Sequence, residues 1–264
     1  MLLTRVLTAA VLLPIVVAAI FLGGPWLAGV LALFLLLAYY EFAHLMGEAG
    51  LRRGPFALGF LLIFVLILDA HLASYDLAAP ALAFTLLLAL SWQVLQRGQK
   101  APATLWCISM AGAIYLGWLG RCVVLLRNLP LGLQWLLLAL VTTWITDSGA
   151  YFVGRAFGRH KMVPRLSPRK TWEGALGGWL IGVAGGMLVG WALGLGWQHG
   201  LMVGLLASTA APFGDLSVSM FKRQVGAKDT GKLLPGHGGM WDRLDSPLFV
   251  VPVVYYYALW FGAL

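Results

Sequence analysis

The chain has 264 residues, of which 61% are hydrophobic and 11% are charged, and its formal net charge is +8. Soluble domains carry about 25% charged residues, so this composition excludes a water-soluble fold and predicts an all-α membrane protein that crosses the bilayer several times. The cations lie in short loops between apolar spans, which disfavours nucleic acid as a partner and favours anionic membrane lipid.

Apolar runs that could cross a bilayer, which takes about 20 residues per helix, recur about nine times along the chain. They lie at residues 5–22, 26–46, 56–72, 80–95, 104–125, 133–152, 175–196, 201–213 and 247–261. The eighth run is short, and we expect its helix to continue through Asp215 to Arg223. We divide the chain into N-terminal transmembrane helices at residues 1–130 and a catalytic transmembrane region at residues 131–264.

The positive charges predict the orientation of these spans. One set of alternate loops holds nearly all of them, including residues 48–53, 155–170 and 214–246, whereas the other set holds few. Cytoplasmic loops are enriched in Lys and Arg. We therefore expect the N-terminus inside, the C-terminus outside, and a polar cavity that faces the cytoplasm.

A carboxylate lies inside the sixth apolar run, at Asp147 in the sequence Thr-Asp-Ser-Gly-Ala-Tyr. A charged group at membrane depth is costly, and it faces a partner, an ion or a water-filled cavity. Two interpretations stay open. Asp147 lines a cavity in which it binds a ligand, or it pairs with an arginine and holds two helices together.

The loop at residues 159–174 is strongly basic, with six cations between Arg155 and Lys170. Part of this charge is a topology signal. Ser167 followed by Pro168 is typical of a helix start, with a capping residue before a proline. The exposed amides of that helix start, beside Arg169 and Lys170, would suit phosphate oxygens. For Glu173 we expect a structural role, either capping this turn or pairing with Lys170.

The segment at residues 214–246 is a long polar stretch between two apolar ones. Its ionisable residues are Asp215, Lys222, Arg223, Lys228, Asp229, Lys232, His237, Asp242, Arg243 and Asp245. Three-residue spacing would place Asp242 and Asp245 on one helical face. Clustered carboxylates repel one another unless a cation lies among them, and magnesium takes one or two carboxylates together with substrate phosphates.

The basic residues of this segment suit the phosphates of such a metal-bound ligand. Lys222, Arg223 and Lys228 supply charge for phosphate oxygens. His237 could donate to a phosphate or carry a proton, although a loop histidine is also a common structural hydrogen-bonding group. The alternative for the whole segment is a solvated loop with ion pairs, which does not explain its glycine and proline spacing or a carboxylate at membrane depth.

Three motifs together resemble the phosphatidate cytidylyltransferases, also called CDP-diacylglycerol synthases. The pattern S-x-x-K-R-x4-K-D-x-G-x3-P-G-H-G-G-x2-D-R-x-D runs without a break from Ser219 to Asp245. Residues 167–174 are similar to the upstream S-P-x-K-T-x-E-G motif of that family, and residues 147–151 are similar to its D-x-x-A-Y element. The resemblance covers the C-terminal half closely, and the N-terminal half agrees in hydropathy.

This resemblance implies a nucleotidyltransferase of phospholipid biosynthesis that converts CTP and phosphatidic acid into CDP-diacylglycerol and pyrophosphate. It implies a magnesium-dependent site with which potassium is also associated, a homodimer, and a bacterial cytoplasmic (inner) membrane location. The metal-binding aspartates of the family match Asp215 and Asp242. The implied catalytic residues are Asp215, Lys222, Arg223, Lys228, Asp229, His237 and Asp242, and the implied substrate-binding residues are Asp147, Ser167, Arg169, Lys170, Arg243 and Asp245.

Two other functions remain open from the sequence. A related lipid enzyme, such as a CTP-dependent polyprenol kinase or a synthase that uses an archaeal-type lipid, would need similar phosphate chemistry. A transporter could use intramembrane carboxylates to bind an ion, but it would be expected to show repeated halves. The sequence contains one charged cluster and no evident repeat.

Overall fold

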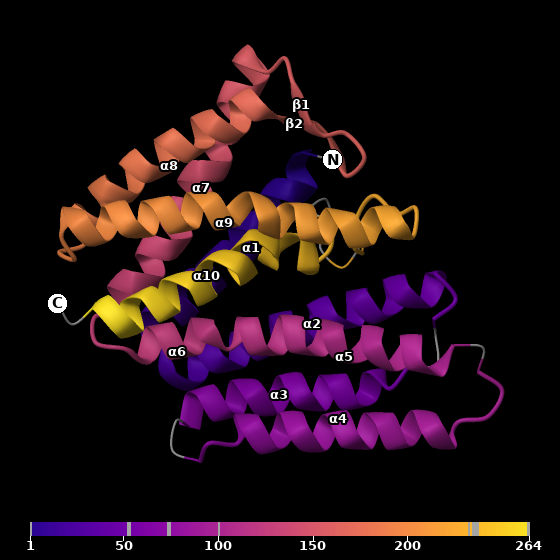
Figure 1. The fold of residues 1–264 in the computed structure, drawn as a ribbon. Coiled ribbons are helices and arrows are strands. Elements are labelled where there is room, and N and C mark those ends of the chain that lie inside the picture. Colours follow the sequence, from indigo (N-terminus) through magenta and orange to yellow (C-terminus); the bar gives the residue numbers. More distant parts are fainter. Residues whose placement is uncertain are drawn as a thin grey trace. The chain divides into compact units, whose positions relative to one another are not determined.

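The computed structural model describes residues 2–51, 54–72, 75–99, 101–231, 233 and 238–262. These residues form ten α-helices and one two-stranded antiparallel sheet (Figure 1). Seven helical segments are long and apolar enough to cross a membrane, and two shorter apolar ones lie at Ala10–Leu22 and Phe56–Leu72. The predicted all-α, multi-span fold is confirmed.

The chain divides into two compact units, each built from segments that are distant in the sequence. The first unit contains Met1–Leu125 and Asp229–Asp242, and the second contains Leu126–Lys228 and Arg243–Leu264. Part of the polar segment at residues 214–246 therefore belongs to each unit.

The first unit consists mainly of helices α1 (Leu2–Leu22), α2 (Gly24–Glu48), α3 (Phe56–Leu72), α4 (Ala78–Leu95) and α5 (Pro102–Gly120). Helices α2 to α5 lie side by side (Figure 1). Their close packing uses glycine opposite aromatic rings, because a Cβ added at Gly59 or Gly112 would overlap the ring of Tyr39 or Phe42. A turn at Arg121 separates α5 from the short helix α6 (Cys122–Asn128), and the two together form one apolar segment, Pro102–Asn128, that is long enough to be the predicted fifth span.

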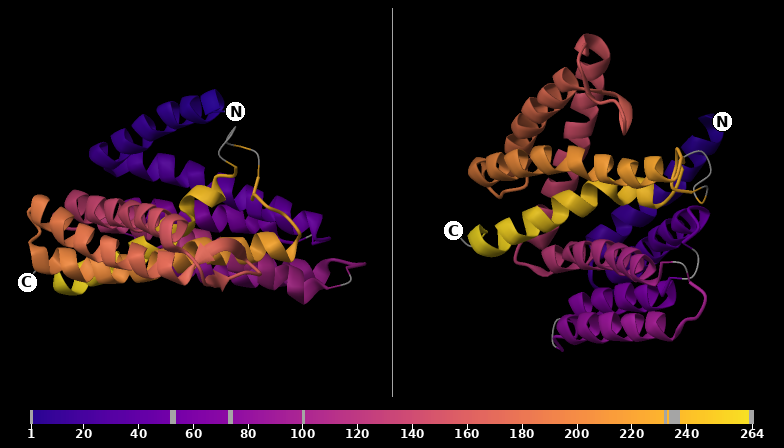
Figure 2. Two further views of the ribbon diagram at one scale, coloured as in Figure 1. Left: turned by 90° about the horizontal axis from the view of Figure 1, so that it is seen from above. Right: turned by 45° about the vertical axis from the view of Figure 1, so that its right-hand side comes forward.

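The second unit contains α7 (Gly132–Phe157), β1 (Lys161–Val163), β2 (Ser167–Thr171), α8 (Trp172–Ala192), α9 (Trp197–Gln224) and most of α10 (Trp241–Phe261). Helices α7, α8 and α9 pack against one another, and the β1–β2 hairpin connects α7 to α8 (Figure 2). The buried residues of α8 are glycines at every fourth position: Gly174, Gly178, Gly182, Gly186 and Gly190. Small residues at this spacing let neighbouring helix backbones approach closely.

Replacing Gly182 by alanine is expected to destabilise this three-helix packing. A Cβ at Gly182 would overlap the hydroxyl oxygens of Thr146 and Ser208, which are hydrogen-bonded to each other at 2.9 Å. Overpacking of this kind costs about 1–3 kcal/mol. Gly29→Ala is the matched control, because Gly29 lies in helix α2 with open space around it. Thermal unfolding in detergent should show a lower Tm for G182A alone, and equal Tm values for both variants would contradict the expectation.

In the polar segments, the structure confirms the expected continuation of one helix, and it shows that the Asp242–Asp245 segment, whose conformation the sequence left open, is helical. Helix α9 continues through Asp215 and ends at Gln224, so Asp215 lies on a regular helix. Helix α10 begins at Trp241, so Asp242 and Asp245 lie three residues apart on one helix.

The predicted helix start at Ser167 is wrong. Ser167–Thr171 forms strand β2, in which Ser167 pairs with Val163 and Thr171 pairs with Lys161. Helix α8 begins at Trp172, where the Thr171 side chain accepts a hydrogen bond from the Gly174 amide. Pairing with β1 makes residues 167–171 extended, so Pro168 lies within a strand and Thr171 is the cap of the helix.

Candidate active site

A pocket with a volume of about 490 Å³ lies in the second unit. Helices α7, α8 and α9 and both strands of the β1–β2 hairpin contribute its lining residues: Asp147, Ala150, Tyr151, Gly154, Arg155, Met162, Arg169, Lys170, Thr171, Gly174, Ala175, Pro212 and Asp215. The structure thus brings together four of the residues predicted from the sequence, namely Asp147, Arg169, Lys170 and Asp215. Tyr151, Arg155 and Met162 were not predicted as site residues, although Tyr151 belongs to the D-x-x-A-Y element.

An ion pair links two walls of this pocket. The Lys170 ammonium lies 2.7 Å from Asp215 Oδ2 and donates a longer hydrogen bond, 3.5 Å, to the carbonyl oxygen of Pro212. Both charged side chains keep partial solvent access, 25% for Lys170 and 39% for Asp215. A half-exposed pair contributes little to stability, so its significance lies in placing a cation and a carboxylate in one pocket.

Asp147 faces the same two charges. It experiences repulsion from Asp215 and attraction from Lys170. The alternative of an arginine partner for Asp147 finds no support in the described part of the chain, where the ion pairs within 4.0 Å involve other residues. Arg155 instead donates to the hydroxyl of Tyr151 at 3.2 Å. Two carboxylates and one lysine therefore share this cavity.

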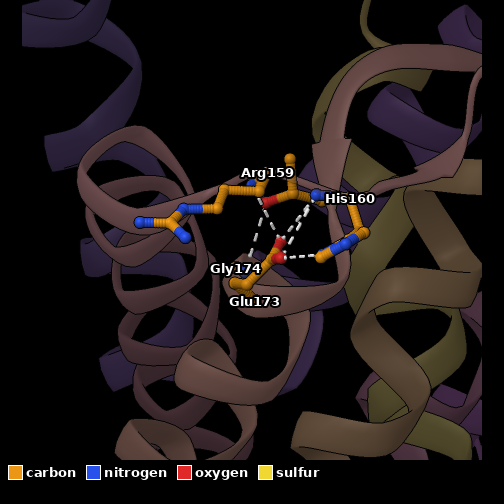
Figure 3. A network of polar contacts seen from close by, with 5 residues as sticks. Arg159, His160, Glu173 and Gly174 are labelled. Atoms are coloured by element: carbon orange, nitrogen blue, oxygen red, sulfur yellow. Dashed lines mark hydrogen bonds and ion pairs between the residues drawn. The ribbon is translucent and has the colours of Figure 1, made fainter.

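Glu173 holds the basic hairpin in place (Figure 3). Its carboxylate accepts hydrogen bonds of 3.1 Å from the Arg159 amide and 3.1 and 3.2 Å from the His160 amide, and it lies 2.6 Å from His160 Nδ1. The predicted pairing of Glu173 with Lys170 is wrong, because Lys170 points to Asp215. Glu173 has the structural role that we expected, but it fulfils it by binding the backbone amides of Arg159 and His160, just before β1.

Removing this carboxylate should loosen the hairpin. Glu173→Ala removes the carboxylate that accepts from the amides of Arg159 and His160, so these amides turn to water and the segment leading into β1 loses its anchor to α8. Limited trypsin digestion should then cut faster after Arg159, Lys161 or Arg165. Glu48→Ala is the control, since Glu48 is exposed and contacts His44 on its own helix. Unchanged cleavage in the hairpin of E173A would contradict this role.

Arg223, predicted to bind phosphate, makes two backbone contacts in the structure. Its Nε donates to the Leu166 carbonyl at 3.2 Å and its Nη1 donates to the Ala227 carbonyl at 3.0 Å. Arg223 thereby ties the end of α9 to the hairpin turn. Lys222 precedes it in the last turn of α9, where cations are favoured by the helix dipole.

A second cluster lies in the first unit, around Asp242. Asp242 Oδ2 accepts hydrogen bonds from the Thr230 amide at 3.0 Å, the Thr230 hydroxyl at 3.0 Å and the Gly239 amide at 3.2 Å. These bonds hold Thr230 and Gly239 against the first turn of α10. The carboxylate of Asp242 is therefore held by its own loop.

Glu41 of helix α2 completes this cluster, and it was not predicted as a site residue. It is 2% exposed and accepts hydrogen bonds from the Thr230 hydroxyl and the Trp241 amide. The sequence could have indicated Glu41 in the same way as Asp147, because Glu41 is a lone carboxylate within the apolar run at residues 26–46.

The remaining predicted residues are distributed over both units. Asp229 lies in the first unit, and Ser167, Lys228, Arg243 and Asp245 lie in the second. His237 lies outside the described residues.

The donor set of the pocket fits a magnesium ion that is shared with phosphate. In the part of the chain that the structure describes, no group of three or more His, Cys, Asp or Glu side chains converges as a closed metal cage. Magnesium binds through one or two carboxylates, several waters and substrate phosphates, and Asp147 and Asp215 line one cavity.

The apolar helices and the charged pocket define a multi-span integral membrane protein with a site suited to an anionic ligand. The chain belongs to the cytidylyltransferase family, whose profile matches residues 3–261. This confirms the family indicated by the signature motifs.

Three relatives, each named phosphatidate cytidylyltransferase, illustrate the similarity. The protein of Pseudomonas aeruginosa PAO1 is 38% identical over 269 residues, covering 96% of this chain and 95% of the relative. That of Bacillus subtilis strain 168 is 36% identical over 209 residues, covering 76% and 77%. That of Brucella suis biovar 1 is 43% identical over 155 residues, and there the match covers 58% of this chain and 57% of the relative.

Proposed function

We propose that this protein transfers the cytidylyl group of CTP to phosphatidic acid, forming CDP-diacylglycerol and pyrophosphate. The observation that carries the proposal is the pocket in which Asp147 and Asp215 of two membrane-spanning helices meet Arg169 and Lys170 of strand β2. The relatives named phosphatidate cytidylyltransferase support the same substrates. A cavity within a helical membrane protein would let the acyl chains remain in lipid while the nucleotide enters from water.

The reaction requires positioning and charge neutralisation more than acid–base chemistry. A phosphate oxygen of phosphatidic acid attacks the α-phosphorus of CTP, and the bond from that phosphorus to the bridging oxygen of pyrophosphate breaks. The lipid phosphate is already ionised near neutral pH, so no strong base is needed. Lys170 and Arg169 neutralise phosphate oxygens and hold them in line, which is how phosphoryl-transfer sites lower the barrier.

We propose Asp215 and Asp242 as the residues that bind magnesium, on the strength of the signature, with Asp147 beside Asp215 in the pocket. A bound magnesium ion would supply positive charge to the triphosphate, and potassium is proposed as a second cation. Lys170 then serves as the counter-charge of Asp215 before substrate binds, since it lies within 2.7 Å.

The remaining assignments also rest on the signature. We propose catalytic roles for Lys222, Arg223, Lys228, Asp229 and His237, and substrate-binding roles for Ser167, Arg243 and Asp245. The backbone contacts of Arg223 suit a residue that orders the loop around the phosphates. We propose residues 131–264 as the catalytic region, and a homodimer as the assembly.

The deciding experiment incubates purified protein with CTP, magnesium and phosphatidic acid, and measures CDP-diacylglycerol and pyrophosphate. We expect both products in equal amounts. A parallel reaction with a polyprenol tests the related kinase function. Phosphorylated prenol as the product, or no transfer to any lipid, would overturn the proposal.

We further propose that the protein lies in the bacterial inner membrane with its site facing the cytoplasm, its N-terminus inside and its C-terminus outside. The basic loops support this orientation. A reporter enzyme that works only in the periplasm should be active when it is fused to the C-terminus. A reporter that works only in the cytoplasm should be active when it is fused after Gln224. A cytoplasmic signal from the C-terminal fusion would contradict the nine-span arrangement.

A further inference from the structure

Glu41 is a buried carboxylate that the proposed reaction does not use. It lies in helix α2, is 2% exposed, and is flanked by the fully buried side chains of Tyr39 and Phe42. Burying a charged group is costly unless hydrogen bonds compensate for the lost water. The partners of Glu41 should therefore explain why an acidic residue occupies this place.

Those partners come from the signature segment, distant in the sequence and part of the same unit. Glu41 Oε2 accepts a 3.0 Å hydrogen bond from the amide of Trp241 and a 3.1 Å hydrogen bond from the hydroxyl of Thr230. Trp241 is the first residue of α10, and a first-turn amide has no acceptor within its own helix. Glu41 therefore caps α10 from another helix, while the Phe42 ring packs edge-on against the Trp241 ring at 5.3 Å.

The hydroxyl of Thr230 links Glu41 to Asp242. Its oxygen lies 3.1 Å from Glu41 Oε2 and 3.0 Å from Asp242 Oδ2. A threonine hydroxyl has one proton to donate, so it lies between two carboxylates that both attract it. Any shift of Glu41 changes the hydrogen bond that Asp242 receives.

The loop around this link leaves no room for larger residues. A Cβ at Gly239 would overlap both the Thr230 hydroxyl and Glu41 Oε2, and a Cβ at Gly231 would lie 2.5 Å from Glu41 Oε1. Because both residues are glycines, the backbone at Gly231 and Gly239 can lie in direct contact with the Glu41 carboxylate.

We propose that Glu41 is a positioning residue, which orients Asp242 through the Thr230 hydroxyl and sets the start of α10. It acts through these groups and does not touch the substrate. The catalytic consequence rests on the proposed function, because it requires Asp242 to belong to the reacting site.

The first test needs no substrate. Hydrogen–deuterium exchange of the purified protein is compared for wild type, Glu41→Gln and Thr230→Val, with exposed Glu48→Gln from the same helix as control. E41Q removes the charge of the acceptor, and T230V removes the hydroxyl that joins the two carboxylates. Exchange of the Thr230, Gly239 and Trp241 amides should therefore rise by about tenfold in both variants, and E48Q should match wild type. Wild-type exchange in E41Q and T230V would overturn the proposal.

The second test measures transfer and its magnesium dependence. E41Q and T230V should lose about tenfold in kcat and need more magnesium for half-maximal rate, whereas Thr230→Ser, which keeps the hydroxyl, should restore both. Wild-type kcat and magnesium dependence in E41Q and T230V would overturn the positioning role. If E41Q does not fold, T230V and T230S carry the same comparison. If wild-type protein shows no transfer, the proposed function fails, and the exchange experiment still decides whether Glu41 holds the segment.

Discussion

Asp215→Asn is expected to abolish cytidylyl transfer while the protein remains folded. Asparagine keeps the size of the side chain but removes the charge that pairs with Lys170 at 2.7 Å and that is proposed to bind magnesium. Removing one preorganised electrostatic group from an active site costs about 10²–10³-fold in kcat, and a metal-binding carboxylate is such a group. The measurement is the rate of pyrophosphate and CDP-diacylglycerol formation by purified protein.

The control for this variant is Asp76→Asn. Asp76 is exposed and has a backbone φ of 45°, which asparagine tolerates. It should keep wild-type activity, and both variants should keep the wild-type Tm. Full activity in D215N would remove Asp215 from the proposed metal site.

Asp242→Asn is expected to abolish turnover as well, for a different structural reason. Asp242 Oδ2 gathers two amides and one hydroxyl of its own loop. An asparagine would present one neutral oxygen to these three donors in place of a charged one. Charged acceptors of this kind are worth about 1.5–3 kcal/mol per hydrogen bond, so both loop order and the proposed metal ligand are lost.

The activity of D242N is measured by the same assay, and hydrogen exchange of the loop provides the second measurement. We expect faster exchange at Thr230 and Gly239 together with the loss of turnover. If exchange rises while turnover stays at the wild-type rate, Asp242 is a structural residue only. The D76N variant again provides the baseline.

Hydropathy and motif spacing predicted a large part of this molecule. The apolar runs and the continuation of α9 past Asp215 followed from local composition, whereas the start of α10 at Trp241, before the apolar run at residues 247–261, did not. This is expected, because a bilayer requires each span to satisfy its own backbone, so a helix can be inferred from its own residues. The family was also evident from the signature at residues 219–245.

The hairpin at residues 161–171 shows where local signals failed. Ser167 and Pro168 have the composition of a helix start, but pairing with Val163 and Lys161 makes the segment extended. Glu173, in the first turn of α8, accepts hydrogen bonds from the amides of Arg159 and His160. Sequence spacing predicts neither the pairing of the two strands nor the partners of Glu173, because several backbone donors lie at similar distances from it along the chain.

By itself, the sequence determined that this chain spans the membrane, and it predicted that the segments around Asp147, Lys170 and Asp215 belong to one polar site. Only the tertiary structure decided which charges meet. Lys170 pairs with Asp215, and Glu41 joins Thr230 and Trp241 across about two hundred residues of chain. The physical reason is that a buried carboxylate must find its donors in three dimensions, and those donors are backbone amides and a hydroxyl that no sequence pattern distinguishes.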